Sequence, residues 1–225
     1  MPTIIAIDGP SGAGKGTVAR AIAESLKYRH VDTGAMYRAV GWKAQRDGIA
    51  LDDESAVAEL ARRADIIVEG GRVEIGAHDV TRAIRTPEID KAASSVARLP
   101  RVREVLVARQ RGLAETGGVV MEGRDIGTKV FPDAEVKIFL DAAPEIRGTR
   151  RFQQSPAAAT HEASVVAELQ ARDQRDRTRA NSPLVPAPDA VLIDSTYLTL
   201  DQVLARAVEV IEARLSRSQQ SEMQA

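Results

Sequence analysis

The sequence contains no cysteine and few aromatic residues. None of the 225 residues is Cys, which excludes disulfide bonds and metal sites built from thiolates. Aromatic side chains make up only 3% of the chain, so the hydrophobic core has to consist mainly of Val, Ile, Leu and Ala. The chain is long enough for one sizeable α/β domain that carries insertions.

An excess of one charge and long apolar runs are also missing. The formal net charge is −1, which argues against a broad basic surface for nucleic acid. No apolar run reaches the length of a membrane span, and no charged and then apolar leader precedes the first apolar segment. No heptad pattern is evident. We therefore expect a monomer in the cytoplasm, with no nucleic-acid partner and no membrane association.

The segment GPSGAGKGT at residues 9–17 has the pattern of a phosphate-binding loop. The apolar stretch before it predicts a buried strand, and residues 15–27 repeat apolar side chains with helical spacing. The glycines let backbone N–H groups turn toward an anion. The helix N-terminus adds a partial positive charge, and Lys15 adds a full one. The pattern predicts a site for a nucleotide polyphosphate, and a Gly-rich turn before an ordinary helix is the less favoured alternative.

One position departs from the usual form of this loop. The Lys is usually followed directly by a Ser or Thr whose hydroxyl binds Mg²⁺. Here Gly16 follows Lys15, and the hydroxyl comes one position later, at Thr17. The loop therefore indicates phosphate chemistry in which this hydroxyl is not required next to the Lys.

Apolar periods and turn residues predict alternating strands and helices. Strands are expected at 3–8, from 29, at 119–122, at 136–141 and at 189–194. Helices are expected from 15, from just after Thr33 to Gly48, at 51–64, from Pro87, from Pro100 to Gly117 and at 199–215. Asp52 or Asp53 is expected to cap the third helix, and Thr199 with Gln202 to form a capping box. This order favours an α/β fold of three layers, a parallel sheet with helices on both faces, in which ligands bind at the carboxyl ends of the strands.

Residues 65–77 depart from the pattern of alternating strands and helices. Two short runs of alternating apolar and polar residues flank Gly70 and Gly71 and predict a β-hairpin. A hairpin within an α/β series suggests an insertion. We expect a single domain over residues 1–215, with an insert at about 34–98 and a lid at about 147–180. The polar segment 216–225 is expected to be disordered.

Charged side chains gather where the expected strands end. Glu122, Arg124 and Asp125 follow one strand, Asp141 ends the next, and Asp32 precedes a helix. Each of them alone could be a helix cap or a surface ion pair. Several charged groups at the same sheet edge as the phosphate-binding loop favour a functional site.

Arginine is concentrated between residues 147 and 179, where there are seven Arg and no Lys. Guanidinium groups bind phosphate oxygens in a bidentate way and stay charged at any physiological pH. They also stabilise the charge on a phosphoryl group during transfer. The alternative is a solvated helix on which Asp173 and Asp176 pair with neighbouring arginines. We favour a closing lid.

Six blocks of sequence resemble the bacterial cytidylate kinases, which are P-loop nucleoside monophosphate kinases. They are IDGPSGAGKGT, DTGAMYR, IRTPEI with AASSVARLPRVRE, EGRDIGTKVFPDA, KIFLDA, and RDQRDRTR with PLVPAPDA, in order between residues 4 and 213. The expected hairpin lies where this family carries an enlarged insert that binds the nucleoside monophosphate.

The resemblance implies transfer of the γ-phosphoryl group of MgATP to CMP, and to dCMP, giving ADP and CDP or dCDP, in pyrimidine nucleotide metabolism. The acceptor phosphate is already anionic, so positioning and charge neutralisation suffice without a general base. Two alternatives are a P-loop kinase for another small molecule, such as UMP, AMP or shikimate, and a nucleotide-sensing P-loop module without catalysis.

The resemblance also implies roles for individual residues. The implied catalytic residues are Lys15, Arg124, Arg151 and Arg179. The residues implied to bind ATP are Gly9, Pro10, Ser11, Gly12, Ala13, Gly14, Lys15, Gly16, Thr17 and Arg147. The residues implied to bind CMP are Thr33, Tyr37, Arg38, Ser94, Arg103, Arg124, Asp125, Arg172, Asp176 and Arg179.

In this family Gly takes the place of the Mg²⁺-binding hydroxyl, and the ATP phosphates with ordered waters hold the metal, so no dedicated metal site is expected. Glu122 stands where Asp is common, which leaves its part in ordering these waters open. Thr33 replaces a common Ser and keeps the hydroxyl. The lid segment 152–166 matches no block, so which arginines contact ATP is also open. We interpret the three histidines, His30, His78 and His161, as structural.

Overall fold

The structure is a computed structural model that describes residues 3–154 and 161–224. The chain divides into two compact units. Unit 1 comprises Met1–His30 and Thr116–Ala225, and unit 2 comprises Val31–Glu115. The insert expected at about 34–98 falls within unit 2, although the domain boundaries given by the sequence remain a prediction. Residues 155–160 of the expected lid lie outside the described residues.

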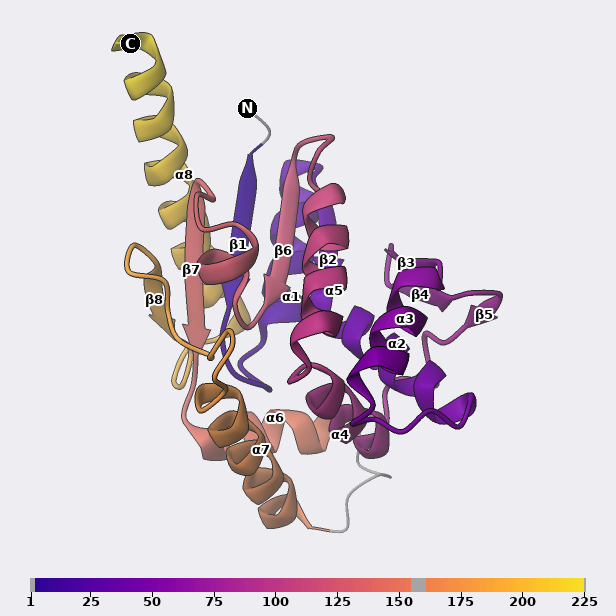
Figure 1. The fold of residues 1–225 in the computed structure, drawn as a ribbon. Helices are drawn as coiled ribbons and strands as arrows, with labels where there is room; N and C mark the ends of the chain where they lie inside the picture. The colour runs from indigo at the N-terminus through magenta and orange to yellow at the C-terminus, as the bar shows by residue number, and fades with distance from the viewer. Residues whose placement is uncertain (1–2, 155–160, 225) are drawn as a thin grey trace. The chain divides into compact units, whose positions relative to one another are not determined.

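The described part of the chain contains a five-stranded sheet in the order β2-β6-β1-β7-β8 (Figure 1). Its strands are β2 (Arg29–Asp32), β6 (Val119–Gly123), β1 (Ile4–Asp8), β7 (Val136–Asp141) and β8 (Val191–Asp194). Strand β1 pairs in parallel with β6 and β7, and β7 pairs in parallel with β8. All five residues of β6 are buried, which agrees with the apolar run at 119–121. The prediction of a parallel sheet flanked by helices is confirmed.

Helices α1 (Lys15–Leu26) and α8 (Leu200–Gln224) pack on this sheet in unit 1. Val18 and Ile22 of α1 share a core with Val203 of α8 and with Ile5 and Ile138 of the central strands. Unit 1 also contains α6 (Pro144–Gln154), α7 (Glu162–Arg177) and the short π-helix η1 (Ile126–Val130), which follows β6. The strand-to-helix succession expected around the phosphate-binding loop is therefore confirmed.

Unit 2 combines helices with a three-stranded antiparallel sheet. Its elements are α2 (Thr33–Arg46), α3 (Glu54–Arg63), β3 (Ile66–Glu69), β4 (Arg72–Ile75), β5 (His78–Asp79), α4 (Pro87–Val96) and α5 (Pro100–Gly112). The predicted hairpin is confirmed, because β3 pairs antiparallel with β4 around Gly70 and Gly71. The strand β5 was not predicted, because its two residues are too few to show an alternating pattern.

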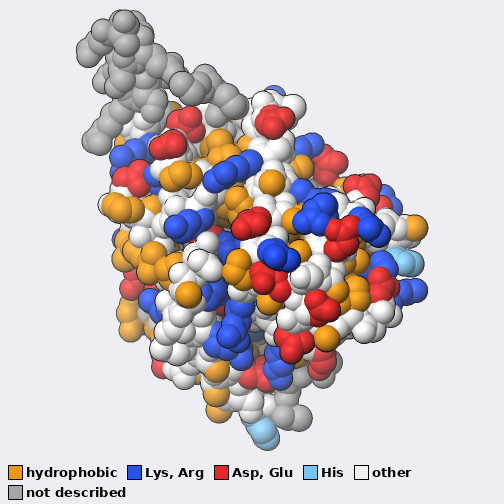
Figure 2. All heavy atoms as spheres, in the orientation of Figure 1, with side chains coloured by type: hydrophobic (Ala, Val, Ile, Leu, Met, Phe, Trp, Pro, Cys, Tyr) orange, Lys and Arg blue, Asp and Glu red, His pale blue; other side chains and the backbone are white. Residues whose placement is uncertain are grey.

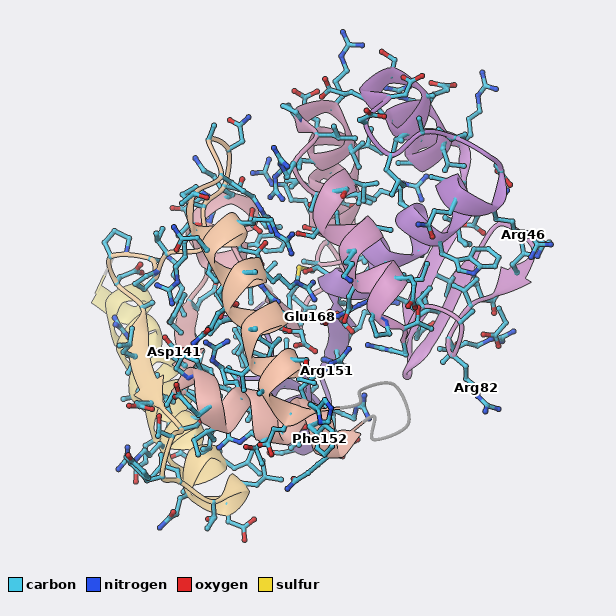
Figure 3. The ribbon with its side chains drawn as sticks, turned by 90° about the horizontal axis from the view of Figure 1, so that it is seen from below. Arg46, Arg82, Asp141, Arg151, Phe152 and Glu168 are labelled. Atoms are coloured by element: carbon cyan, nitrogen blue, oxygen red, sulfur yellow. The ribbon has the colours of Figure 1, made fainter. Side chains whose placement is uncertain are left out.

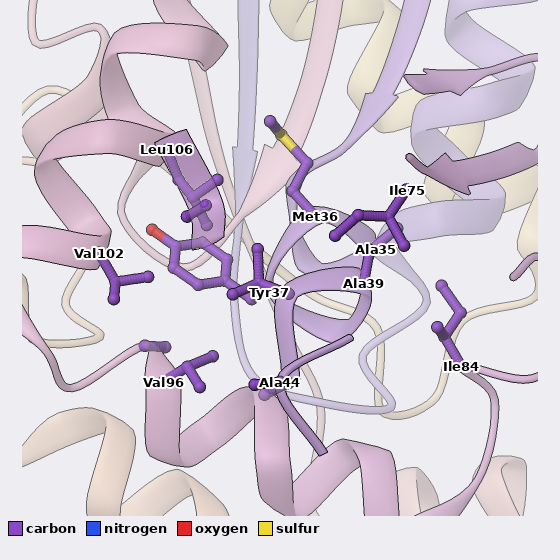
Figure 4. Packing of buried hydrophobic residues seen from close by; sticks show 14 of the residues in the cluster. Ala35, Met36, Tyr37, Ala39, Ala44, Ile75, Ile84, Val96, Val102 and Leu106 are labelled. Atoms are coloured by element: carbon purple, nitrogen blue, oxygen red, sulfur yellow. The ribbon is translucent and has the colours of Figure 1, made fainter. Parts of the chain in front are cut away.

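The core of unit 2 is made by small and branched side chains (Figure 4). Tyr37 is its buried aromatic residue and lies with Val102 and Leu106 of α5 in this cluster. Helices α2 and α4 approach closely at Gly41, where a Cβ would lie 3.1 Å from the Cβ of Ala92. A larger residue at position 41 would push these two helices apart.

Most helix ends agree with the signals in the sequence. Asp53 caps α3 by accepting from the backbone N–H of Ala56 at 3.0 Å. The capping box of α8 is present, since Thr199 N–H donates to Gln202 Oε1 at 2.9 Å and Gln202 N–H donates to Thr199 Oγ1 at 3.3 Å. Helix α5 ends at Gly112 and not at Gly117 as expected, so this prediction was wrong by about one turn.

Helix α8 extends through Gln224 and so includes most of the segment 216–225 for which the sequence predicts disorder. Residues 216–225 contain no glycine or proline, so nothing local ends the helix there. Residue 225 lies outside the described residues.

Charged side chains of both signs are interspersed with apolar ones on the face in Figure 2, which agrees with the net charge of −1. Among the described residues, no helix is long and apolar enough to cross a membrane.

Candidate active site

The loop between β1 and α1 needs glycine at two positions. Gly9 has φ +148°, and a Cβ there would lie 1.9 Å from the carbonyl oxygen of Leu140 in β7. Gly12 has φ +78°, and its Cβ would lie 2.8 Å from the carbonyl oxygen of Arg147. Non-glycine residues rarely adopt such φ values, and both sites face backbone that has no room to move. The glycine pattern therefore fits the loop between a central strand and the helix α6.

Lys15 begins α1 and is buried, with Nζ donating to the carbonyl oxygen of Pro10 at 2.7 Å. Burial, followed by the positive charge of Arg124, lowers the pKa of Lys15 to about 7. The carboxylates of Glu122 and Asp8 act in the opposite direction. The ammonium is therefore held across the loop at a position where further negative charge would favour its protonated form.

The position of Gly16 explains the departure from the usual loop pattern. A Cβ at Gly16 would lie 3.0 Å from Oε1 of Glu122, so a carboxylate already occupies the space in front of this residue. The same oxygen lies 3.1 Å from Nε2 of His30. A side chain at position 16 would require the Glu122 carboxylate to move by a few tenths of an ångström.

The side chains near the loop decide how the expected Mg²⁺ could be held. In the described ranges, 3–154 and 161–224, no group of three or more His, Cys, Asp or Glu side chains could hold a metal ion. The single carboxylate of Glu122 beside Gly16 is suited to accept hydrogen bonds from waters on a nucleotide-bound Mg²⁺, which readily keeps several of its waters.

Arg124 and Arg179 form a charged cluster around the buried Asp176 in unit 1. Arg124 Nε donates to Asp176 Oδ2 at 3.1 Å, and Arg179 Nη2 donates to Asp176 Oδ1. Burial acts to raise the pKa of Asp176, but Arg124, Arg179 and Arg172 outweigh it and hold that pKa below its usual value. The carboxylate stays ionised and keeps two guanidinium groups side by side. Arg179 follows the end of α7 at Arg177, and its hydrogen bond to Asp176 holds its guanidinium group in place.

Arg147 lies in a different environment from the other arginines of the expected lid. It is 3% exposed, and its Nη1 donates to the carbonyl oxygen of Ser11 at 2.9 Å. Its Nε donates to the carbonyl oxygen of Ala142 at 2.8 Å, and its guanidinium pairs with Asp173 of α7. Arg147 thus connects the phosphate-binding loop to α7 through hydrogen bonds that the sequence did not predict.

Helices α6 and α7 pack tightly against each other. A Cβ at Gly148 of α6 would lie 2.2 Å from Cγ2 of Val166 in α7, so only glycine allows this approach. Arg151 lies on α6 and Glu168 on α7 (Figure 3). The arginines between 147 and 179 are therefore distributed over two paired helices and the residues that follow α7.

The residues expected to bind the acceptor nucleoside belong to unit 2, except for those in the segments 124–125 and 172–179. The guanidinium carbon of Arg103 on α5 lies 5.7 Å from the ring centre of Tyr37 on α2, and Arg103 Nη1 donates to the carbonyl oxygen of Ala97 at 3.5 Å. Arg38 Nε donates to Asp90 Oδ1 at 2.8 Å. Thr33 at the start of α2 and Ser94 of α4 are buried. Unit 2 thus places cationic, aromatic and hydroxyl groups on three adjoining helices.

Asp8 is the main residue near the loop that the sequence did not single out. It ends β1 and is 5% exposed. Its Oδ1 accepts from the N–H of Ile126 and its Oδ2 accepts from the N–H of Gly127, both at 2.8 Å. The signal was present, because an Asp directly before the loop ends a buried strand, but a lone Asp after a strand is most often structural.

Comparison with known proteins gives a match over nearly the whole chain. The family model for cytidylate kinase matches residues 5–213. A protein named cytidylate kinase from Solibacter usitatus is 45% identical, over 95% of this chain and 94% of its own. One from Pelotomaculum thermopropionicum is 49% identical, over 94% and 95%, and one from Vibrio cholerae is 46% identical, over 94% and 97%.

Solved structures give an independent view of the fold. A gluconokinase from Sinorhizobium meliloti superimposes with a TM-score of 0.52 at 16% identity, over 98% of this chain and 97% of its own. This likeness supports the P-loop kinase fold alone, whereas the sequence match extends from β1 into α8. The chain belongs to the cytidylate kinase family.

Proposed function

We propose that this protein transfers the γ-phosphoryl group of MgATP to CMP, and also to dCMP, and releases ADP with CDP or dCDP. The observation that carries the proposal is the buried Lys15 at a Gly-rich loop, with Arg124 and Arg179 held together in the same unit by Asp176. Phosphoryl transfer depends mainly on positioning and on neutralising the charge that spreads over the transferred group. Fixed cations near a nucleotide phosphate site supply that neutralisation.

The residues of unit 1 take the following parts in the proposed reaction. Backbone N–H groups of residues 9–17 bind the ATP phosphates, and Lys15 follows the transferred group toward the acceptor. Arg124, Arg151 and Arg179 neutralise the developing charge. Arg147 is proposed to support the backbone of the phosphate-binding loop, because it donates hydrogen bonds to the carbonyl oxygens of Ser11 and Ala142. Mg²⁺ enters as part of the nucleotide, with Glu122 accepting from its waters.

The acceptor requires no general base, because its phosphate is already anionic at neutral pH. In unit 2, Arg38 is proposed to bind the acceptor phosphate, and Thr33, Tyr37, Ser94 and Arg103 to bind the nucleoside. In unit 1, Asp125 is proposed to face the base, with Arg172 and Asp176 toward the ribose. We also propose that the protein is cytoplasmic and that it acts as a monomer. Sedimentation of the purified protein tests the oligomeric state.

The test of the function is an acceptor screen. The protein is incubated with MgATP and separately with CMP, dCMP, UMP, AMP, GMP and shikimate, and the products are separated by chromatography. We expect CDP and dCDP as the main products. A main product from another acceptor would assign a different kinase activity, and no product from any acceptor would favour a nucleotide sensor.

The protein is expected to take up a proton when it binds ATP at pH 8. Lys15 has a pKa of about 7 in the free protein, so it is mostly neutral at pH 8. Phosphate oxygens placed next to it raise its pKa and bring in up to about one proton. Calorimetry in buffers of different ionisation enthalpy measures this uptake. An observed binding enthalpy that is the same in every buffer would contradict the prediction, and Lys15→Met is the control that should abolish the uptake.

A further inference from the structure

The carboxylate of Asp8 connects two segments of the site that are far apart in sequence. Asp8 directly precedes Gly9, the first residue of the phosphate-binding loop. Its two oxygens accept from the N–H groups of Ile126 and Gly127, each at 2.8 Å. These two residues directly follow Arg124 and Asp125, so one buried side chain fixes the end of β1 against the segment that carries both.

The local backbone explains why an acidic side chain is needed there. The π-helix η1 begins at Ile126, and the first N–H groups of a helix have no partner within the helix. Asp125, which precedes η1, makes no side-chain hydrogen bond to cap it. Asp8 supplies two acceptors in place of a cap.

The surroundings of Asp8 shift its pKa in both directions. Burial raises the pKa of Asp8 to about 6 despite its two backbone hydrogen bonds, and the negative charge of Asp125 acts in the same direction. Lys15 acts in the opposite direction. An ionised carboxylate is thus kept at a site that disfavours its charge. Asparagine would fill a similar space without a charge, but it has a single acceptor oxygen and would place an NH₂ group against the second N–H donor.

We propose that Asp8 is a positioning residue for phosphoryl transfer, which sets Arg124 and Asp125 relative to the phosphate-binding loop through the N–H groups of Ile126 and Gly127. The inference rests on the proposed function, because its effect is measured on that reaction. Arg124 is held from one side by Asp176 and from the other by this backbone clamp. A misplacement of about 1 Å in such a group lowers a rate by up to about 10²-fold.

Asp8→Asn tests the proposal, because the amide keeps the shape of the side chain and presents an NH₂ group to one of the two N–H donors. We expect kcat to fall by about 10-fold to 10²-fold and KM for ATP to change by less than about threefold. The matched control is Asp53→Asn, since Asp53 also accepts from a backbone N–H but caps α3 in unit 2. Thermal unfolding of each variant gives the folded fraction used to correct kcat. Wild-type kcat in a folded Asp8→Asn protein would overturn the proposal.

A second measurement uses the wild-type protein and does not depend on how the variant folds. The amide signals of Ile126 and Gly127 are followed by NMR from pH 5 to 8 in the protein without nucleotide. The nucleotide is omitted because its own phosphate ionises near pH 6. We expect both signals to shift with a midpoint at about 6, the pKa of Asp8. Signals that do not move would overturn the clamp.

The wild-type acceptor screen separates the two possible failures. If wild-type protein forms no CDP, the proposed function is wrong, and the NMR titration alone still decides whether Asp8 holds the segment. If wild-type protein forms CDP and Asp8→Asn keeps its kcat, the function stands and Asp8 is only structural.

Discussion

In a folded Lys15→Ala protein, turnover of MgATP and CMP is expected to fall by about 10²-fold or more. Lys15 is the cation at the start of α1, and it is held across the loop by the carbonyl oxygen of Pro10. Its removal leaves the backbone N–H groups of the loop but takes away a full charge from the transferred phosphoryl group. The loss should therefore appear mainly in kcat, and less in KM for ATP.

The measurement is the steady-state rate of CDP formation, with circular dichroism to show that the variant is folded. Lys43→Ala is the matched control, because Lys43 lies on α2 and pairs with Asp47, the residue that directly follows this helix. The control should keep wild-type turnover. Near-normal turnover in folded Lys15→Ala protein would remove Lys15 from the proposed mechanism.

The Asp125→Asn substitution is expected to reduce the preference for CMP over UMP. Cytosine offers an N4 amino group to a carboxylate, whereas uracil presents an oxygen at the same place. Asp125 is 6% exposed, so uracil would place an oxygen lone pair against a buried carboxylate. Sites of this kind discriminate by roughly 10⁴ when burial is complete. Asn donates as well as accepts, so the ratio of kcat/KM for CMP over UMP should fall by about 10²-fold or more.

The alternative is that Asp125 only supports Arg124 at the acceptor phosphate. In that case both substrates weaken by the same factor and the ratio is unchanged, which the same pair of kcat/KM measurements detects. Asp133→Asn is a suitable control, because Asp133 is an exposed residue of the loop after η1 and should leave both values as in the wild type.

Local signals were sufficient for the parts of the fold that depend on neighbouring residues. The turn at 70–71 and the capping box at Thr199 depend on residues a few positions apart, and the glycines at 9 and 12 belong to a contiguous loop pattern. The structure confirms each of them. The end of α5 was misjudged because Gly112 ends the helix before the Gly pair at 117 and 118 that the sequence offered. The sequence does not predict the extension of α8, because a polar composition is typical of disordered segments.

The sequence does not predict the contacts of the candidate site that join residues far apart in the chain. Asp8 and Ile126 are separated by 118 positions, and no local pattern indicates that they meet. The same holds for Arg147, whose partner Asp173 is 26 positions away on another helix. A guanidinium at position 147 was interpreted as a nucleotide contact because the type of side chain is evident from sequence, whereas its hydrogen-bond partner is set by packing.

The chain of unit 2 leaves unit 1 and returns to it at adjacent positions, since the N–H of Arg29 donates to the carbonyl oxygen of Gly118 at 2.8 Å. The connection through unit 2 affects the order in which the two units fold. Pairing of β1 with β6 has to close a connection that includes residues 31–115. Closing about 85 flexible residues costs about 2.5 kcal/mol more in chain entropy than closing about five. Unit 2 has a core made of its own residues, between positions 35 and 106. If unit 2 folds first, it brings the ends of this connection together, so the central sheet is expected to form faster after unit 2 than before it.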